Sequence, residues 1–475
     1  MTRREFIKKM IIGAGLLFCG CEHLLGDDHG RERGRERGGA LPIRSDNPSI
    51  RLHHNRCRNC GRCRGFCRNT MGVFGQAVPA GEDTCTYCGQ CTLFCTRAIT
   101  ERYHYREVNQ AISAAGKIVI ATTAPAIRVA LGEMYRLSPG TNVEGKIVGA
   151  LKHIGVDHVL DATFAADLTV MEEASELLER LENNSAKNPL PMFTSCCPAW
   201  IRFVKLFYPS FLPNLSTVKS PLLMQGTLVK TYFAQKTGID PAKIVCVALT
   251  PCTAKKAEIL LPGKNAAGVM HGKAEMRDVD FVLTCRELAY LLNLNNVNFL
   301  QMQDAPYSSL MGTGSGAGMI FGNTGGVMEA SLRTAYRLLN NKNPPAKFFN
   351  LTPIRGLNSV RSASVDLGVR TLNVAVAHGT GGLRPFLESI QSGVLKYDFI
   401  EVMACSGGCI GGGGQPVTLM GPTRLKQLRK NALYQRDIGS EIRLSYDNPQ
   451  IKAIYNDFLS EPLSNKAKEL LHIYR

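Results

Sequence analysis

The segment EVMACSGGCIGGGGQP, residues 401–416, places Cys405 and Cys409 within a run of glycines. Glycine has no side chain to pack and loses much conformational freedom when it is ordered. A glycine run in a folded chain therefore predicts a neighbour that approaches the backbone more closely than a β-carbon would allow. The overlapping residues YDFIEVMAC have the pattern of a buried strand that ends at Cys405.

The composition of the chain is that of a globular protein with metal centres. Its 475 residues are enough for two or three domains, and 44% are hydrophobic and 20% charged. The 17 cysteines lie in clusters, which favours metal binding over a disulfide framework. The formal net charge of +17 predicts a solvated basic surface or an acidic partner, and metal-bound thiolates would reduce it. No nucleic-acid-binding motif occurs in the sequence, so no nucleic acid is expected as a partner.

Strand and helix patterns alternate between residues 104 and 430. Buried strands are predicted within residues 116–125, 156–164, 243–251, 279–285 and 371–379. One of the predicted helices is amphipathic and runs from Asp167 to Leu181. This alternation predicts an α/β fold, in which ligands gather at the carboxyl ends of the strands. The cysteines at those ends are Cys196, Cys197, Cys252, Cys405 and Cys409. Cys246 and Cys285 are predicted to be small core residues instead.

Residues 50–103 contain the spacing C-x2-C-x2-C-x3-C twice, as in bacterial ferredoxins with two clusters. The fourth cysteine of each run is expected to bind the other cluster. One 4Fe-4S cluster is therefore assigned to Cys57, Cys60, Cys63 and Cys95. The other is assigned to Cys85, Cys88, Cys91 and Cys67. A pair of structural zinc sites is the alternative. The proline that usually follows the fourth cysteine is replaced by Arg68 and Thr96.

The N-terminus has the pattern of an export signal. Arg3 and Arg4 precede an apolar run from Met10 to Phe18 that is too short to span a bilayer. We interpret residues 1–30 as a twin-arginine signal and residues 31–49 as a charged, glycine-rich linker. A basic amphipathic arm is the alternative. The FCGC motif predicts a lipid anchor at Cys21. Together these features predict a periplasmic or extracytoplasmic protein, tethered to the membrane if Cys21 is lipidated.

Three segments, FTSCCPAW (193–200), TPCTAKKAE (250–258) and EVMACSGGCIGGGGQP (401–416), resemble the signature segments of the diiron (FeFe) hydrogenases. ATTAPAIRVALGE, DLTVMEEASELLERLENN, FGNTGGVMEASLRTA and the tail YDNPQIKAIYNDFLSEPLSNKAKELLH resemble the same family. The resemblance extends from about Arg51 to the C-terminus. It implies a ferredoxin-like domain, a two-lobed α/β catalytic domain over residues 104–430 and a small-subunit-like segment over residues 431–475, an α+β protein overall.

The resemblance also implies a cofactor, the H-cluster, which is a 4Fe-4S cubane joined to a diiron unit with carbonyl, cyanide and a dithiolate bridge. By similarity Cys197, Cys252 and Cys405 hold the cubane, and Cys409 bridges to the diiron unit. From the cysteine pattern alone, four thiolates suit either a cubane or a zinc ion. The glycines would let the backbone close around the inorganic group.

Further contacts to the diiron unit follow from the same resemblance. Lys255 would donate to a cyanide and pair with Glu258, although without the motif it would be taken for a surface lysine. The other implied contacts are Pro125, Ala126, Ser220, Pro251, Phe321 and Met403. By pattern alone Phe321 and Met403 would be core residues. Thr250 stands where the family usually has methionine.

A proton path is implied through Cys196, a water, Glu173, Ser216 and Glu176, ending near Arg180 at the surface. Glu173, Glu176 and Arg180 are spaced i, i+3 and i+7, which places them along one helix face. A solvated acidic face is the alternative. Arginine cannot deprotonate, so Arg180 would only hold the last carboxylate.

The predicted function is the reversible interconversion of H2 with two protons and two electrons, with H2 uptake as the direction that export suggests. The expected partners are a c-type cytochrome or ferredoxin, the twin-arginine export machinery and the maturases that assemble the H-cluster. A non-catalytic iron–sulfur assembly protein and an H2 sensor are the alternatives. Cys196, Lys255, Glu258 and the GGGGQP run argue against an assembly protein. Cys196 and the lack of a recognisable signalling domain argue against a sensor.

Overall fold

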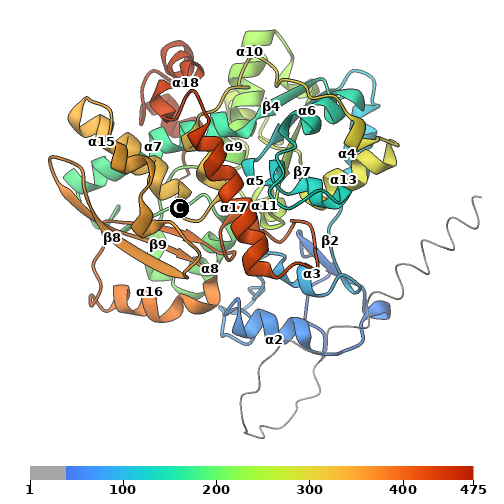
Figure 1. The fold of residues 1–475 in the computed structure, drawn as a ribbon, viewed down its shortest axis with the longest axis horizontal. Helices are drawn as coiled ribbons and strands as arrows, with labels where there is room; N and C mark the ends of the chain where they lie inside the picture. The colour runs from blue at the N-terminus through green and yellow to red at the C-terminus, as the bar shows by residue number, and fades with distance from the viewer. Residues whose placement is uncertain (1–38, 474–475) are drawn as a thin grey trace, which may run out of the picture. The chain divides into compact units, whose positions relative to one another are not determined.

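The computed structural model describes residues 39–473. The predicted signal, Cys21 and the linker before residue 39 lie outside the described residues. Two four-stranded sheets form the centre of the described part (Figure 1). In that view the first sheet lies to the right of the long helix α17 (Pro422–Ile438), and the second lies to its left. Within residues 39–473, no helix combines the length and the apolar character needed to cross a bilayer.

The first sheet consists of β3 (Ile118–Thr123), β4 (His158–Asp161), β6 (Ile244–Thr250) and β7 (Phe281–Thr284). The strand order is β4-β3-β6-β7 and all pairs are parallel. All seven residues of β6 are buried, as expected for a parallel strand that is covered on both faces. The covering helices are α6 (Glu144–His153) and α13 (Cys285–Leu294) on one face, and α7 (Ala162–Glu182) and α9 (Pro221–Leu228) on the other.

The second sheet consists of β5 (Met192–Phe193), β8 (Val360–Asp366), β9 (Thr371–His378) and β10 (Phe399–Met403). Its order is β5-β10-β9-β8, and only β8 is antiparallel to its neighbour. One face packs on α7 and α15 (Gly326–Asn340), and the other on α8 (Pro198–Phe207) and α16 (Arg384–Gln391). The predicted two-lobed α/β fold is therefore confirmed, and α7 belongs to the cores of both lobes.

Helix α7 begins earlier than the sequence predicts. The predicted strand over residues 156–164 ends at Asp161, because the Asp161 side chain accepts a hydrogen bond from the Thr163 N–H and caps the helix. The helix is buried on nearly all sides because both sheets pack on it. The alternative of a solvated acidic face is therefore wrong for Glu172, Glu173 and Glu176, while Glu179 and Glu182 are exposed. Cys246 and Cys285 are buried, as predicted.

The ferredoxin-like domain lies at the bottom of Figure 1, in blue. It pairs β1 (Ile50–Leu52) antiparallel with β2 (Ile99–Glu101), and its helices are α2 (Arg62–Asn69) and α3 (Gln90–Phe94). Its core begins before residue 50, because Leu41 packs with Ile50 and Ile99. Buried Asn47 accepts hydrogen bonds from the N–H groups of Ser49 and Ile50. The prediction of a linker up to residue 49 is therefore wrong for residues 39–49.

The glycine run contacts protein backbone at very short range. A β-carbon on Gly412 would lie 2.4 Å from the Pro251 carbonyl oxygen, and one on Gly413 would lie 2.2 Å from the Cys88 carbonyl oxygen. The Gly414 N–H donates to Pro251 O over 2.8 Å. The neighbours that require glycine here are thus the end of β6 and the ferredoxin-like domain. Our expectation that the glycines make room for an inorganic group is corrected at these two positions.

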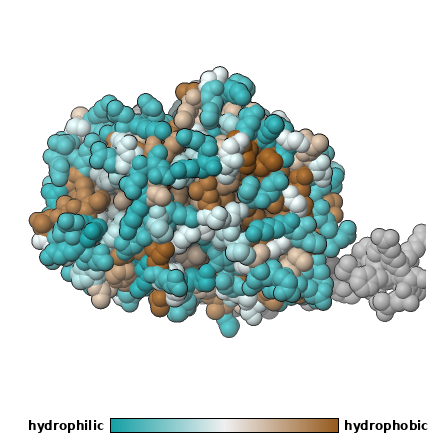
Figure 2. All heavy atoms as spheres, turned by 90° about the horizontal axis from the view of Figure 1, so that it is seen from above, coloured by the Kyte–Doolittle hydropathy of each residue, from teal (hydrophilic) through white to brown (hydrophobic). Residues whose placement is uncertain are grey.

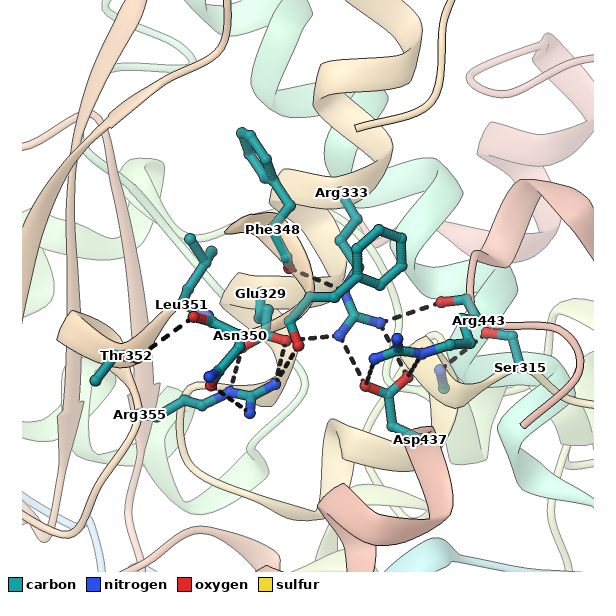
Figure 3. Close-up of polar contacts among 12 residues, drawn as sticks. Ser315, Glu329, Arg333, Phe348, Asn350, Leu351, Thr352, Arg355, Asp437 and Arg443 are labelled. Atoms are coloured by element: carbon teal, nitrogen blue, oxygen red, sulfur yellow. Dashed lines mark hydrogen bonds and ion pairs between the residues drawn. The ribbon is translucent and has the colours of Figure 1, made fainter. Parts of the chain in front are cut away.

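The C-terminal segment is anchored by buried charges (Figure 3). Asp437 in α17 accepts hydrogen bonds from Arg333 of α15 over 2.9 Å and from Arg443 over 2.8 Å. Arg333 also pairs with Glu329, which binds Arg355 as well. Because α17 runs without interruption from 422 to 438, the predicted domain boundary at residue 430 is wrong.

The surface seen in Figure 2 is mainly hydrophilic, with hydrophobic residues in separate patches. The ion pair of Arg333 with Asp437 is not part of this surface, because both side chains are fully buried.

We expect Gly413→Ala to destabilise the protein by about 1–3 kcal/mol or more, because two backbones would have to separate. Gly421→Ala is the control, since a β-carbon there meets no atom within 4 Å. It should change stability by less than about 0.5 kcal/mol. Thermal and urea unfolding of the purified variants measure both effects. Equal stability of the two variants would show that the contact at Cys88 is not a tight one.

Candidate active site

A cavity of about 100 Å³ lies where the carboxyl ends of strands from both sheets meet. Strand β3 leads to Pro125 and Ala126, β6 leads to Pro251 and β10 ends at Met403. Of the contacts predicted for a diiron unit, six line this cavity: Pro125, Ala126, Pro251, Lys255, Phe321 and Met403. The tertiary structure thus brings together residues that are almost 280 positions apart in the sequence, as the α/β pattern predicts.

Four cysteines converge on this cavity and the loop beside it. Cys197, Cys252 and Cys409 line the cavity, and the Ala404 N–H, next to Cys405, lies 3.5 Å from the Cys197 sulfur. Burial, with the nearby Cys197 thiol as a second cause, raises the pKa of the Cys409 thiol to about 12. Burial and the neighbouring Cys252 sulfur likewise raise the pKa of Cys405 far above its ordinary value.

These thiols fit the H-cluster by their chemistry. Buried thiols with raised pKa values ionise only with a compensating positive charge, which a bound metal centre supplies. The donor set contains four cysteines and no nitrogen or oxygen ligand, which suits an iron–sulfur cluster. All four are free thiols in the structure. Among the described residues, no group of three or more His, Cys, Asp or Glu side chains is placed to hold a single metal ion.

Lys255 supplies the positive charge of the cavity wall. Its Nζ donates to Glu258 Oε2 over 2.8 Å and to the Cys196 carbonyl over 3.0 Å. Burial lowers the pKa of Lys255, but Glu258 outweighs it and the net shift is upward, so the ammonium group stays charged. Lys255 is 8% exposed, so the alternative of a surface lysine is wrong.

Ser220 and Glu258 stand behind Lys255. The Ser220 hydroxyl donates to Glu258 Oε2 over 3.2 Å, and neither residue lines the cavity. The structure therefore places Ser220 as a support for Glu258, whereas we predicted a direct contact to the diiron unit. Thr250, which replaces the usual methionine, does line the cavity.

Two residues near the site were not predicted to have a role there. Gln90 of the ferredoxin-like domain donates to the Cys405 sulfur over 3.2 Å and to the Gly411 carbonyl over 2.7 Å. Its position between the predicted cluster ligands Cys88 and Cys91 could have indicated that it lies near a metal site. Glu401 is the first residue of the glycine-rich segment 401–416, and no role was expected for it. It accepts hydrogen bonds from the backbone N–H groups of Gly325 and Met328. Burial raises the pKa of Glu401 to about 7.

The predicted proton-path residues form a buried row. The Ser216 hydroxyl donates to Glu176 Oε2 over 2.7 Å, and it lies close enough to Glu173 to lower the pKa of that carboxyl in part. Burial, with the charge of Glu176 as a second cause, raises the pKa of Glu173 to about 8. Burial and the charge of Glu173 also raise the pKa of Cys196 well above its ordinary value, which places the two groups near each other. Oε2 of Glu173 has no hydrogen-bond partner among the described residues.

Arg180 does not reach the surface, contrary to our prediction. It is 2% exposed. It donates to Glu176 Oε1 over 2.6 Å and to the carbonyls of Pro189, Pro213, Asn214 and Leu215. These carbonyls belong to the chain around β5 and to the segment before Ser216, which fold over the helix and exclude solvent.

The sequence matches two family models. Residues 117–413 match "Iron only hydrogenase large subunit, C-terminal domain", and residues 423–474 match "Iron hydrogenase small subunit". The chain belongs to the iron-only (FeFe) hydrogenase family. The second match begins at the start of α17.

Three relatives illustrate the similarity. The NADP-reducing hydrogenase subunit HndD of Solidesulfovibrio fructosivorans is 41% identical over 88% of this chain, and the chain spans 66% of its length. The periplasmic [Fe] hydrogenase large subunit of Nitratidesulfovibrio vulgaris is 40% identical over 78% of this chain and 86% of its own. The apo structure of a variant of the [FeFe]-hydrogenase HydA1 from Chlamydomonas reinhardtii has a TM-score of 0.68 and 37% identity. It covers 78% of this chain and 98% of its own.

Proteins with other names are also similar to this chain. The cytosolic iron–sulfur assembly component 3 of Mus musculus is 31% identical over 75% of this chain and 74% of its own. Membership of the iron-only hydrogenase family implies iron–sulfur clusters and the H-cluster, while the number of additional clusters rests on the cysteine spacing.

We expect Glu173→Gln to change how stability depends on pH. In the folded protein Glu173 keeps its proton up to about pH 8, whereas its ordinary pKa is 4.5. Between these values the folded state binds more protons, so this group lowers stability as pH rises. Glutamine does not titrate, so the variant should gain stability relative to the native protein as pH rises from about 5 to about 8. Thermal unfolding of both proteins across that range tests this, and parallel curves would contradict it.

Proposed function

We propose that the protein catalyses the reversible interconversion of H2 with two protons and two electrons. The observation that carries the proposal is the buried cavity lined by Cys196, Cys197, Cys252, Cys409 and the Lys255 ammonium group, with Cys405 in the loop beside it. When bound, the H-cluster supplies a redox-active iron centre at which H2 is split or formed. The chain supplies ligation, exclusion of water and separate routes for protons and electrons.

Ligation is divided among three segments. Cys197, Cys252 and Cys405 would hold the cubane, and Cys409 would bridge to the diiron unit. Lys255 would donate a hydrogen bond to an anionic ligand of that unit, because it stays charged beside Glu258. Met403 and Phe321 present apolar surface to the cavity and help to exclude water.

Cys196 is the group that would exchange protons with the site. It lines the cavity, precedes a proposed ligand and is not itself among the proposed ligands. Glu173, Ser216 and Glu176 would carry protons onward, because carboxyl and hydroxyl groups both donate and accept. A carboxyl whose pKa is about 8 is suited to exchange protons near neutral pH.

Electrons would travel through the ferredoxin-like domain. The Cys88 thiol, a ligand of one proposed 4Fe-4S cluster, lies close enough to raise the pKa of Cys405, and Gln90 bonds the Cys405 sulfur. Two clusters are proposed from the eight cysteines, in the sets that the sequence spacing suggests. The outer cluster would include Cys60, which is exposed.

An iron–sulfur assembly protein is the second candidate, because relatives with that name are similar to this chain. The presence of Cys196 and Lys255 around one cavity, with Glu258 behind it, supports the enzyme instead. We place the protein outside the cytoplasm, with export by the twin-arginine machinery and a lipid on Cys21 as further proposals. This location favours H2 uptake and agrees with the periplasmic relative. Maturases would assemble the H-cluster.

The electron partner is proposed to be a redox protein with an acidic face. Arg56, Arg58 and Arg62 are exposed and lie within four residues of Cys60. No acidic residue occurs between Asp46 and Glu82. This charge pattern favours a ferredoxin over a cytochrome whose surface is rich in lysine, although part of the charge would be offset by the clusters.

We expect Cys196→Ala, Glu173→Gln and Glu176→Gln to keep the infrared bands of carbonyl and cyanide but to lose H2 turnover in both directions. General acid–base groups contribute about 10²–10⁴-fold to rates, so losses in that range are expected. Cys409→Ala should instead lose the bands. Glu182→Gln, exposed on the same helix, is the control. The assays use enzyme that was coexpressed with maturases. Full H2 turnover in Cys196→Ala would contradict the proposed proton route. Native protein that shows neither the infrared bands nor H2 turnover would contradict the proposed hydrogenase function.

We expect the triple variant Arg56→Glu, Arg58→Glu, Arg62→Glu to reduce the association rate with an acidic 2[4Fe-4S] ferredoxin about 10-fold or more at low salt, with the difference fading at high salt. A matched control reverses three exposed charges elsewhere: Lys342, Arg370 and Lys396. Binding by biolayer interferometry across a salt series measures the effect. Faster binding of a lysine-rich cytochrome to the native protein would overturn the choice of partner.

A further inference from the structure

Gln90 connects the ferredoxin-like domain to a proposed ligand of the H-cluster cubane. It is the first residue of α3 and lies between Cys88 and Cys91, two proposed ligands of a ferredoxin-type cluster. Its side chain is 7% exposed and reaches across the interface to Cys405. One buried side chain therefore touches the catalytic site, while its backbone belongs to the proposed electron route.

The nitrogen of the Gln90 amide, and not its oxygen, faces Cys405. The same atom, Nε2, lies 2.7 Å from the Gly411 carbonyl oxygen and 3.2 Å from the Cys405 sulfur. A carbonyl oxygen can only accept hydrogen bonds, so the atom beside it must be the NH2 group. This group has two hydrogens, one for each acceptor. The contact with Gly411 therefore fixes the donor side of the amide toward the sulfur.

The residues on both sides of Gln90 hold it in this position. Gly89, which precedes it, has a φ of +65° and lies so close to Thr253 that a β-carbon would be 2.2 Å from the Thr253 hydroxyl oxygen. On the other side, the Thr92 hydroxyl donates to the Gly413 carbonyl over 3.1 Å. Because both flanks are fastened to the catalytic domain, the donor is already in place when the sulfur needs it.

We propose that Gln90 is a positioning residue that raises the reduction potential of the H-cluster cubane through its hydrogen bond to Cys405. The inference rests on the proposed function, because it takes Cys405 as a ligand of that cluster. An iron–sulfur cluster becomes more negative when it is reduced, and part of the added charge resides on the ligand sulfurs. A donor directed at such a sulfur therefore stabilises the reduced state more than the oxidised state.

The position of Gln90 between two clusters gives this effect a direction. The equilibrium concerned is the transfer of one electron between the proposed cluster bound by Cys85, Cys88, Cys91 and Cys67 and the cubane. No proton moves and no covalent bond changes. The Gln90 side chain bonds a sulfur on the catalytic side of the interface, so it favours the electron on that side.

The competing explanation is that Gln90 only fastens the ferredoxin-like domain to the glycine-rich loop. Gln90→Met removes both hydrogen bonds but keeps the length of the side chain. Gln90→Lys also changes the packing, but it keeps a donor at a similar reach and adds a positive charge. Thr92→Val is the control, because it removes the bond to Gly413 and loosens the same interface without touching Cys405. Loss of fastening alone would not move the potential in opposite directions in the two Gln90 variants.

The variants are measured as the holoenzyme, by infrared spectroscopy at controlled electrode potentials. The carbonyl bands report the charge of the diiron unit, which is joined to the cubane, so they distinguish this cluster from those of the ferredoxin-like domain. We expect Gln90→Met to lower the ratio of reduced to oxidised cubane about tenfold at a fixed potential, which is a shift of about 59 mV for one electron. Gln90→Lys should raise this ratio. Thr92→Val should lower thermal stability but leave the ratio near its native value.

An unchanged ratio in Gln90→Met would overturn the inference, and so would a shift of equal size in Thr92→Val. A ratio that is lowered or unchanged in Gln90→Lys would also overturn it, even where Gln90→Met does not carry the infrared bands. Native protein that carries the bands without H2 turnover would overturn the proposed function alone, because the potentials of the variants can still be compared. Native protein without the bands would overturn both.

Discussion

The backbone of residues 412–414 lies against the backbone of Pro251 and of Cys88 at distances that exclude any side chain. The rest of the site depends on this contact. It holds the Cys409 loop beside Pro251, which lies between the end of β6 and Cys252, and it brings the ferredoxin-like domain against the same loop. Arg286 and Thr92 secure it, because both donate to the Gly413 carbonyl. The loop therefore sets the distance between the predicted electron route and the catalytic cavity.

Around this loop the interior contains several ionisable groups. Lys255 with Glu258, and Glu401 with backbone N–H groups, are satisfied by partners that the polypeptide itself provides. The buried thiols are different, because burial raises their pKa values and a positive metal centre is needed to ionise them. The thiols of the site therefore need a positive charge that the polypeptide does not supply and a bound metal centre would. Because water is excluded, each of these charges acts strongly on its neighbours.

Helix α7 connects the two lobes and at the same time carries the acidic groups of the proposed proton route. Its first half packs with the sheet of β3 and β6, and its second half with the sheet of β9 and β10. Glu173 and Glu176 leave this helix toward the proposed proton route, whereas Glu172 binds Tyr455 and His472 of the C-terminal segment. The C-terminal segment completes the arrangement, since Arg333 and Asp437 bind α17 to α15 and the tail places His472 beside Thr217.

The sequence alone was enough to predict the α/β class, the proposed ligand sets, most of the cavity wall and the row from Cys196 to Glu176. It could do so because cysteine spacing, buried strands and three specific motifs are local patterns, and because strand ends of one sheet meet at one edge. It did not reveal that Arg180 is buried, that Ser220 stands behind Glu258, that residues 39–49 belong to the ferredoxin-like core or that Gln90 touches Cys405. Each of these depends on contacts between segments far apart in the chain, and such contacts form only when the lobes, the ferredoxin-like domain and the C-terminal tail pack together.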